Sequence, residues 1–391
     1  MNKILLGTTA LVAAGAMAGT AAAADKVKMG VGGYFAAHFA MASQDDGSGV
    51  DLISGTADDE PGANLRSHKL TREGEIIFNG KTVLDNGIEV GAQVQLEAET
   101  CGDQIDESFI WFSGSFGKVQ IGSENSAAYT MMYGPGGTAP HTGLMSANFR
   151  HYATGGNSAG VPTFRINITS DSEKLTYFTP RMSGFQLGIS YTPDNCEENG
   201  GGVAACGGSY AGFQNDHSSG QQSENVEVGA NYRGKLGTVD IGLSAAWSGS
   251  NVEKAAGGGS VVNTEDRDAW GIGGTLGIGN MGLSAAYMQD DMGDARNNGE
   301  YTHWGLGLSY GMGPWKMGLE YSNVEAEDAA TGSGTDDLSG FELGATYAFG
   351  PGITMGAAVQ FVSLDDSRPG TTGNNQANDA TVFILATAIG F

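Results

Sequence analysis

From about residue 224 to residue 391 the sequence repeats one pattern: large apolar residues alternate with small or polar ones, a tight turn follows, and the alternation resumes. One such unit alternates Val226, Val228, Ala230 and Tyr232 with Glu227, Gly229, Asn231 and Arg233. Successive side chains of a strand point to opposite faces, so each hairpin has one apolar and one polar or nearly bare face. The polar face is mostly Gly, Ser, Asp and Glu, which suits a water-filled lumen better than the outside of a soluble sandwich. The pattern therefore predicts an all-β transmembrane β-barrel.

The same pattern, followed along the whole chain, predicts sixteen antiparallel strands, an even number as expected for a bacterial barrel built from one chain. The predicted strands are residues 26–41, 67–83, 88–100, 106–114, 117–124, 173–180, 185–193, 224–234, 237–249, 267–277, 281–290, 300–311, 314–325, 337–348, 353–365 and 379–391.

The connections alternate in length, which supports the barrel more strongly than the strands alone. Short turns carry Gly, Asn, Asp or Pro, as at residues 85–87, 115–117, 182–184, 279–280, 311–314 and 350–352. The other connections, such as residues 42–66, 194–223 and 367–378, are long, polar and acidic. Outer-membrane barrels have short periplasmic turns and long external loops, and we expect that arrangement here.

A set of aromatic residues lies in phase with the apolar face and towards strand ends, where the two membrane interfaces should be. These residues are Trp270, Tyr287, Trp304, Tyr310, Trp315, Tyr321, Tyr347 and Phe361. Single core aromatics of a soluble β-protein would not share one phase and one position.

The N-terminus has the composition of a secretory signal peptide over residues 1–24: Lys3 precedes an apolar run, and Ala22, Ala23 and Ala24 form a small-residue cleavage site. An uncleaved anchor is the alternative. Residues 25–391 contain no apolar run near the ~20 residues that a spanning helix needs. With 65 Gly and only 9 Pro, the composition is neither helical nor disordered. We therefore expect residues 25–391 to form a single barrel domain.

The formal net charge is −25, from 44 acidic and 19 basic residues. Nucleic acid is an unsuitable partner for such a chain, because phosphate binding needs a basic patch. An acidic surface repels anions and gathers cations at any opening that it surrounds.

Three cysteines and one acidic segment raise the question of crosslinks and metals. Cys196 and Cys206 bracket a Gly-rich loop, and we expect them to form a disulfide in an oxidising compartment, with Cys101 left as a free thiol. Flexible backbone with several carboxylates can bind calcium, although a merely solvated acidic loop is the favoured interpretation of the segment and the EF-hand pattern is absent. The carboxylates concerned are Asp45, Asp46, Asp51, Asp58 and Asp59. No other cofactor is indicated.

Three segments of the sequence resemble the Gram-negative general-diffusion porins, most closely the alphaproteobacterial type. They are REGEIIFNGKTVLDNGIEVGAQVQLEAE (72–99), FGKVQIGSENSA (116–127) and a last strand that ends on Phe391. The resemblance implies a sixteen-stranded barrel, assembly as a homotrimer, and a pore in each barrel that the third external loop narrows. It also implies that Phe391 is the signal read by the barrel-assembly machinery.

By that resemblance the constriction loop is residues 125–171, the longest connection in the chain. Its apolar residues suit packing inside a lumen better than exposure to water, although a structured external flap is the alternative. These residues are Tyr129, Met131, Met132, Tyr133, Leu144, Met145, Phe149 and Tyr152.

The loop departs from the family pattern because residues 125–170 contain no Asp or Glu. The loop instead carries the basic residues His141, Arg150, His151 and Arg165. The polar phase of the second and third strands presents the acidic residues Glu73, Glu75, Glu89 and Glu97. We therefore expect a transverse field with a weakly positive loop and a negative wall, unless several of these glutamates line the wall away from the narrowest point.

The leading hypothesis is an outer-membrane channel of a Gram-negative bacterium for passive diffusion of small hydrophilic solutes and ions, with a preference for cations. The alternative is a structural or adhesive barrel whose acidic external loops bind a partner. No nucleophile elbow, HExxH, P-loop or CxxC motif is present, so we do not expect an enzyme. The expected partners are outer-membrane lipid and lipopolysaccharide, the assembly machinery, and two further copies of the chain.

Overall fold

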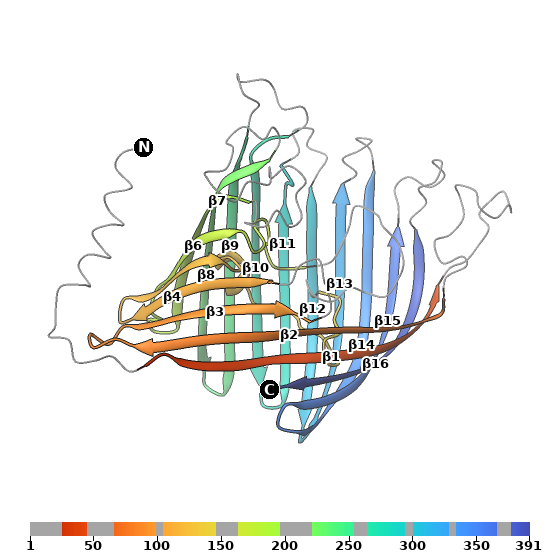
Figure 1. Ribbon diagram of the computed structural model, residues 1–391. Coiled ribbons are helices and arrows are strands. Elements are labelled where there is room, and N and C mark those ends of the chain that lie inside the picture. The colour runs from red at the N-terminus through yellow and green to blue at the C-terminus, as the bar shows by residue number, and fades with distance from the viewer. Residues whose placement is uncertain are drawn as a thin grey trace.

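The computed structural model describes residues 26–44, 66–98, 105–145, 163–195, 221–253, 264–293, 300–327, 334–365 and 377–391. These residues form one closed barrel of sixteen antiparallel strands, in which each strand pairs with its neighbours in the sequence and β1 pairs with β16 (Figure 1). The predicted fold class is confirmed.

The strands are β1 (Lys28–Gln44), β2 (His68–Val83), β3 (Glu89–Glu97), β4 (Glu107–Gly114), β5 (Gly117–Ser123), β6 (Glu173–Phe178), β7 (Phe185–Asp194), β8 (Gln222–Leu236), β9 (Val239–Val252), β10 (Arg267–Ile278), β11 (Met281–Asp290), β12 (Tyr301–Met312), β13 (Trp315–Glu327), β14 (Thr335–Gly350), β15 (Ile353–Asp365) and β16 (Asn378–Gly390). Every predicted strand is present, and the predicted bounds differ from these by three residues or fewer. One short helix, α2 (Ala127–Met131), was not predicted.

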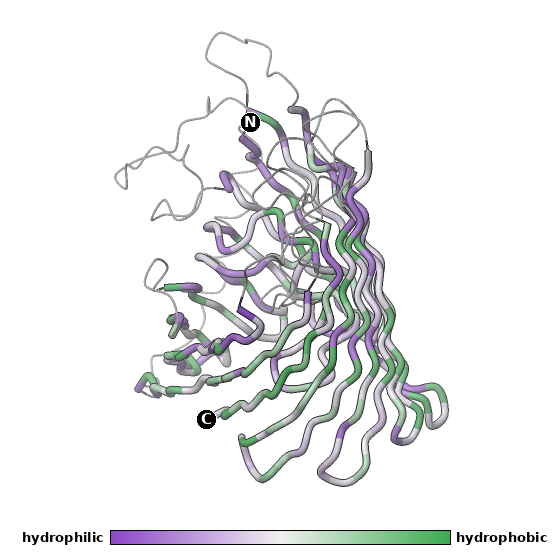
Figure 2. Tube along the Cα trace, turned by 90° about the vertical axis from the view of Figure 1, so that its right-hand side faces the viewer, coloured by the Kyte–Doolittle hydropathy of each residue, from purple (hydrophilic) through white to green (hydrophobic). Residues whose placement is uncertain are grey.

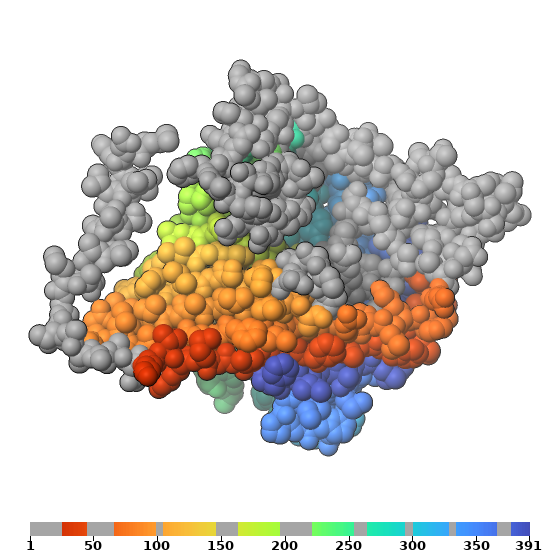
Figure 3. Space-filling view, in the orientation of Figure 1, coloured from red at the N-terminus to blue at the C-terminus, as the bar shows by residue number. Residues whose placement is uncertain are grey.

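The barrel closes where the first and last strands meet. Tyr34 to Gln44 of β1 pair with Gly390 to Ala380 of β16, and the two strands pack side by side in Figure 3. Gly33 and Phe391 then exchange two main-chain hydrogen bonds, of 3.1 and 3.0 Å. The C-terminal residue is thus part of the seam, and its side chain remains exposed.

The outer face carries the apolar half of each alternating pattern, and green and paler or purple positions alternate along the strands in Figure 2. Aromatic residues meet directly across neighbouring strands, as in the pairs Tyr287–Trp304 and Tyr321–Phe341. Trp315 and Tyr347 form a corresponding pair near the other end of the strands, with ring centroids 4.8 Å apart. The predicted aromatic residues therefore share the outer face, in two groups, as interface belts require.

The short connections form tight hairpins at one end of the strands. Gly279 and Gly313 adopt φ of 59° and 58°, values that an L side chain rarely adopts and glycine adopts freely. In Figure 1 the turns between β10 and β11 and between β12 and β13 lie at the lower ends of their strands, and the turn between β2 and β3 lies at the left-hand ends of those strands.

The inner face is less polar than the alternation predicts. Val382 and Ile384 of β16 point into the barrel and are fully buried in an apolar cluster with Leu144. A second apolar cluster inside the barrel includes Met288 and Met132. Both faces of β16 are therefore apolar because one faces outwards and the other is covered by protein inside the barrel.

Several expectations fall outside the described residues and stay predictions. They concern the signal peptide at residues 1–24, the cysteines Cys101, Cys196 and Cys206, the aspartates Asp45, Asp46, Asp51, Asp58 and Asp59, and the loop residues Arg150 and His151. In the part of the chain that the structure describes, no helix has the length and apolar character needed to cross a membrane.

Candidate functional site

The connection after β5 enters the barrel through the helix α2. The Ser126 side chain caps this helix by accepting a hydrogen bond from the Tyr129 amide at 3.2 Å. The main-chain amide of Ala127 donates to Ser190 of β7 at 2.8 Å, which fixes the helix against the inner wall. A serine followed by two alanines is a weak helix signal, and the polar cap is the only sequence feature that could have indicated it.

Beyond α2 the chain follows the inner wall in the direction of increasing strand number. Its polar contacts, in chain order, are Met131 to Asn231 of β8, Tyr133 to Ser244 of β9, Thr138 to Glu342 of β14, Pro140 to His38 of β1 and His141 to Glu73 of β2. Residues 124–145 and 163–172 together are called the inserted loop below. The inserted loop lies inside the barrel, as predicted for the third external loop.

Apolar side chains pack the wall-facing side of the inserted loop against the inner wall of the barrel. Met131, Met132, Leu144 and Met145 are each 3 % exposed or less. Because burial of apolar surface is the dominant favourable term in packing, these residues account for the inward position of the loop. Tyr129 and Tyr133 are half-buried and border the lumen, while Phe149 and Tyr152 lie outside the described residues.

Glu342 of β14 holds the far end of the inserted loop by hydrogen bonds. Its Oε1 accepts from the Thr138 amide at 2.9 Å, from the Thr138 hydroxyl at 2.6 Å and from the Thr142 hydroxyl at 3.1 Å. Its Oε2 accepts from the side-chain amide of Gln360 at 2.7 Å. Glu342 is fully buried, so these contacts are protected from water and are correspondingly strong.

Lys174 of β6 joins the two ends of the inserted loop. Its Nζ donates to the carbonyl oxygens of Glu124, Ser170 and Ser172, the last two at 2.8 and 2.5 Å. A buried ammonium group is costly unless its three donors are satisfied, and here all three reach carbonyl oxygens. The Lys174 side chain therefore holds the first and last residues of the inserted loop together.

Glu124 lies where the inserted loop begins, and its ionisation makes the stability of this part of the barrel depend on pH. Burial raises the pKa of Glu124 to about 7, opposed by Lys118 and assisted by Asp171. A carboxyl group whose pKa is raised on folding binds its proton more tightly in the folded state. Its contribution to stability is therefore present below the ordinary value of 4.5 and is lost as the pH rises through about 7.

We expect the denaturation temperature of the barrel to be lower at about pH 8 than at about pH 5, and expect Glu124→Gln to remove part of this difference. The glutamine cannot ionise, so the variant keeps its stability at the higher pH. Heat-induced band shifts in electrophoresis at the two pH values measure the effect. Glu300→Gln, at an exposed position, is the control. An unchanged pH dependence in Glu124→Gln would contradict the expectation.

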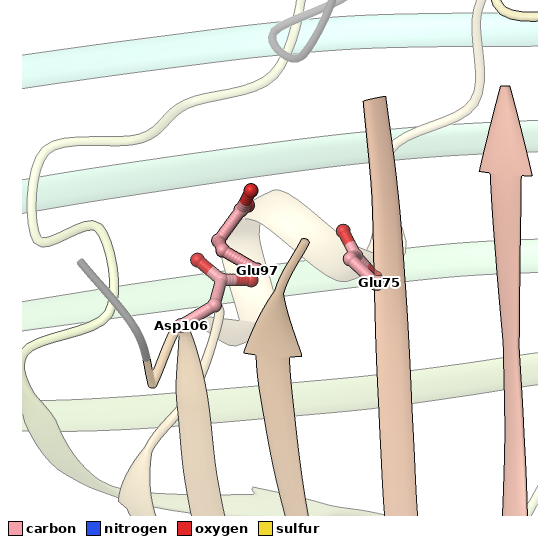
Figure 4. A group of neighbouring side chains, drawn as sticks. All are labelled: Glu75, Glu97 and Asp106. Carbon is pink, nitrogen blue, oxygen red and sulfur yellow. The ribbon is translucent and has the colours of Figure 1, made fainter. Parts of the chain in front are cut away.

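The inner wall on β2–β4 carries a group of carboxylates, called the acidic wall below. It consists of Glu73 and Glu75 of β2, Glu97 of β3, and Asp106, which precedes β4. One carboxylate oxygen each of Glu75, Glu97 and Asp106 lies within 4.8 Å of the others, and the three side chains face the same space in Figure 4. The structure thus brings the predicted Glu75 and Glu97 together with Asp106, and the Tyr34 hydroxyl joins Glu73 to Glu75.

Neighbouring side chains orient the acidic wall. The Tyr34 hydroxyl donates towards Glu73 at 2.8 Å and Glu75 at 3.1 Å, and Gln95 donates to Asp106 at 3.0 Å. Tyr34 and Asp106 were not among the predicted site residues. Glu107 follows the inward phase of the predicted strand, and Asp106, one position earlier, is in the opposite phase, so the alternation did not indicate Asp106.

Glu89 does not belong to the acidic wall. It lies eight positions before Glu97 on the same strand, a separation of about 26 Å at the usual rise of a strand. There its carboxylate pairs with Lys81 at 2.9 Å and accepts from the Trp111 indole at 3.2 Å. The polar phase of the strand was predicted correctly, but position along the strand separates this residue from the other three.

Positively charged or ionisable groups near the inserted loop stack on tyrosine rings. The Arg165 guanidinium lies 4.9 Å from the ring centroid of Tyr129, and the Arg233 guanidinium lies 5.5 Å from that of Tyr133. Such contacts hold a cation in place without neutralising it. Arg233, on β8, was missed because a lone arginine in a polar phase gives no signal of what it contacts.

His141 lies where the inserted loop meets the acidic wall. Its ring stacks on Tyr34 with centroids 4.5 Å apart, and its Nδ1 lies 3.8 Å from Glu73. Burial lowers the pKa of His141, so the ring is neutral at pH 7. Among the described predicted basic residues of the loop, Arg165 therefore carries the positive charge. The lumen has an acidic side on β2–β4 and an aromatic, weakly basic side on the inserted loop.

The sequence matches the family described as Gram-negative porin over residues 7–367. Among curated proteins, an uncharacterized protein of Rickettsia bellii is 24 % identical over 297 residues, covering 62 % of this chain and 67 % of the relative. An uncharacterized protein of Rickettsia conorii is 24 % identical over 301 residues, covering 60 % of this chain and 67 % of the relative.

Solved structures share the architecture at low sequence identity. The anion-selective porin from Comamonas acidovorans has a TM-score of 0.60 and 16 % identity, covering 94 % of this chain and all of that one. OmpF of Salmonella typhi, in complex with daunomycin, has a TM-score of 0.58 and 14 % identity, covering 93 % of this chain and 97 % of that one. The trimer form of OmpT of Vibrio cholerae has a TM-score of 0.58 and 11 % identity, covering 94 % of this chain and all of that one. At these identities the likeness concerns the fold.

Proposed function

The chain belongs to the Gram-negative porin family, and from this premise we propose that it is an outer-membrane channel with a cation preference, through which small hydrophilic solutes and ions diffuse passively. The supporting observation is the inserted loop, which follows the inner wall from β7 to β2 and meets the acidic wall where His141 lies 3.8 Å from Glu73. A loop held inside a closed barrel narrows the passage and sets a size limit for solutes.

The proposed cation preference rests on the acidic wall. Fixed carboxylates at a narrow passage with low-dielectric walls raise the local concentration of cations and repel anions. Burial keeps His141 neutral at pH 7, so the inserted loop offsets little of this charge. The Comamonas neighbour is named as anion-selective, and we infer that selectivity within this fold follows from side chains at the passage.

The proposed transport involves no covalent chemistry and no coupling to an energy source. We also propose that the chain assembles as a homotrimer, as the OmpT neighbour is described in a trimer form. Outer-membrane lipid and lipopolysaccharide would surround the assembly, and its strands would cross the membrane many times. Phe391, exposed at the seam, would be the contact for the assembly machinery.

Reversal potential in a planar bilayer tests this function. With a KCl gradient across the membrane, we expect steady ohmic single-channel steps and a reversal potential of the sign that K⁺ permeation gives. Absence of ohmic steps would refute the channel. Ohmic steps with the sign of Cl⁻ permeation would leave the channel intact and refute the cation preference.

A further inference from the structure

The inner wall beneath the inserted loop is lined with glycines at the positions that the loop touches. We call six of them the glycine seat: Gly188, Gly229, Gly273, Gly318, Gly344 and Gly356, on β7, β8, β10, β13, β14 and β15. Gly188 pairs directly with Gly229 across β7 and β8, and Gly318 pairs with Gly344 across β13 and β14. The glycine seat therefore follows the path of the loop around the wall.

The distances leave no room for a side chain at these positions. A methyl group on Gly273 would lie 1.8 Å from the carbonyl oxygen of Tyr133, and one on Gly229 would lie 2.5 Å from that of Ala127. A methyl group on Gly344 would lie 2.1 Å from the hydroxyl of Thr138. In the first two cases the obstructing atom belongs to the backbone of the inserted loop and cannot rotate away.

At Gly229 and Gly273 the strands themselves do not require glycine, whereas a methyl group on Gly356 would also meet the Ala345 carbonyl oxygen of the neighbouring strand β14 at 2.4 Å. None of the six has φ in the left-handed region, so another residue could adopt the same backbone conformation. Glycine weakens a strand and often marks a place where another backbone approaches closely. Close approach of the inserted loop is the feature of these positions that glycine alone permits.

We infer that the glycine seat sets how deeply the inserted loop lies against the wall, and thereby the width of the passage. The six glycines are positioning residues: they act on solutes only through the loop. This inference rests on the proposed channel function, because conductance is its main measurement. The physical reason is direct, since a loop pushed off the wall can move only towards the lumen.

Three alanine variants form a graded test. Gly273→Ala places a methyl group against the loop backbone, and Gly340→Ala places one 3.0 Å from the side chain of Leu144. Gly311→Ala is the control, because the nearest atom to its added methyl group is the Asn280 carbonyl oxygen at 4.0 Å. We expect single-channel conductance to fall by roughly one third in Gly273→Ala, to fall less in Gly340→Ala, and to match the unmodified protein in Gly311→Ala.

A double substitution distinguishes a displaced loop from general damage to the barrel. In Gly340→Ala the three nearest atoms all belong to Leu144, so Gly340→Ala combined with Leu144→Ala should restore conductance towards that of Leu144→Ala alone. This cycle decides the question if Gly273→Ala does not fold, as judged by its heat-induced band shift. A damaged barrel would not be rescued by shortening a loop residue.

The outcomes separate this inference from the proposed function. A reduced conductance in Gly273→Ala supports the inference, and a larger conductance contradicts it. Conductance equal to that of Gly311→Ala, or no rescue in the Gly340 and Leu144 cycle, overturns it. If the unmodified protein shows no ohmic steps, the channel function fails. In that case a crystal structure of Gly273→Ala tests whether the glycine seat positions the inserted loop. The inference is overturned if Tyr133 lies where it does in the unmodified protein.

Discussion

Glu342→Ala is expected to release the far end of the inserted loop into the lumen, lowering single-channel conductance by roughly one third and increasing the current noise. The substitution removes the acceptor of the Thr138 amide, of two threonine hydroxyl groups and of the Gln360 amide. Each buried donor left without a partner costs about 1–3 kcal/mol. Because the loop can move into the water-filled lumen to satisfy these donors, the structure responds by movement of the loop.

Glu342→Gln is the matched control for this prediction. Its side-chain oxygen can still accept from Thr138 and Thr142, and its amide nitrogen can face Gln360, whose own amide can turn to present oxygen. We expect its conductance to remain close to that of the unmodified protein. Equal conductance and noise in Glu342→Ala and Glu342→Gln would show that Glu342 does not hold the loop.

Neutralising the acidic wall is expected to remove most of the cation preference. In the triple variant Glu75→Gln, Glu97→Gln and Asp106→Asn, three carboxylates within 4.8 Å of one another become neutral groups of the same shape. The permeability ratio of K⁺ to Cl⁻ should fall several-fold in 0.1 M KCl. The change should be smaller in 1 M KCl, where the Debye length falls from about 10 Å to about 3 Å. Reversal potentials at both ionic strengths measure the ratio.

Glu89→Gln provides the comparison within the same face of the barrel. Its carboxylate is paired with Lys81 and lies about 26 Å along β3 from Glu97. We expect its permeability ratio to match that of the unmodified protein. A larger effect from Glu89→Gln than from the triple variant would place the selective region near the ends of the short turns and away from the acidic wall.

The sequence alone was sufficient for the barrel because the evidence for it is local and repeated. The alternation in Val226 to Tyr232 assigns faces to a strand without reference to any other strand, and the turn residues mark where strands end. The same reasoning correctly placed Trp304 and Tyr321 on the outer face. It missed α2, because a helix of five residues has little sequence signal and is stabilised by contacts with β7–β9.

The candidate site was predicted only in part. Alternation identifies the polar face of a strand but not the depth of a residue along the pore, which is why Glu89 was grouped with Glu73, Glu75 and Glu97. The charge of His141 depends on burial, which no sequence pattern states. Glu342 was missed because its partners are loop atoms about two hundred residues away in the sequence. Lys174 was missed because no sequence pattern shows that its ammonium group is buried among carbonyl oxygens.

The sequence by itself determined the closed sheet, its strands and which side chains face lipid, because these follow from period-two alternation and turn chemistry within short segments. The tertiary structure alone decided where the inserted loop lies, which carboxylates meet across β2, β3 and β4, and why Gly229 and Gly273 cannot carry a side chain. The loop position and the glycine contacts depend on atoms more than a hundred residues apart that approach closely, and the carboxylate group depends on how three neighbouring strands align. Only the closed and filled barrel specifies such an approach.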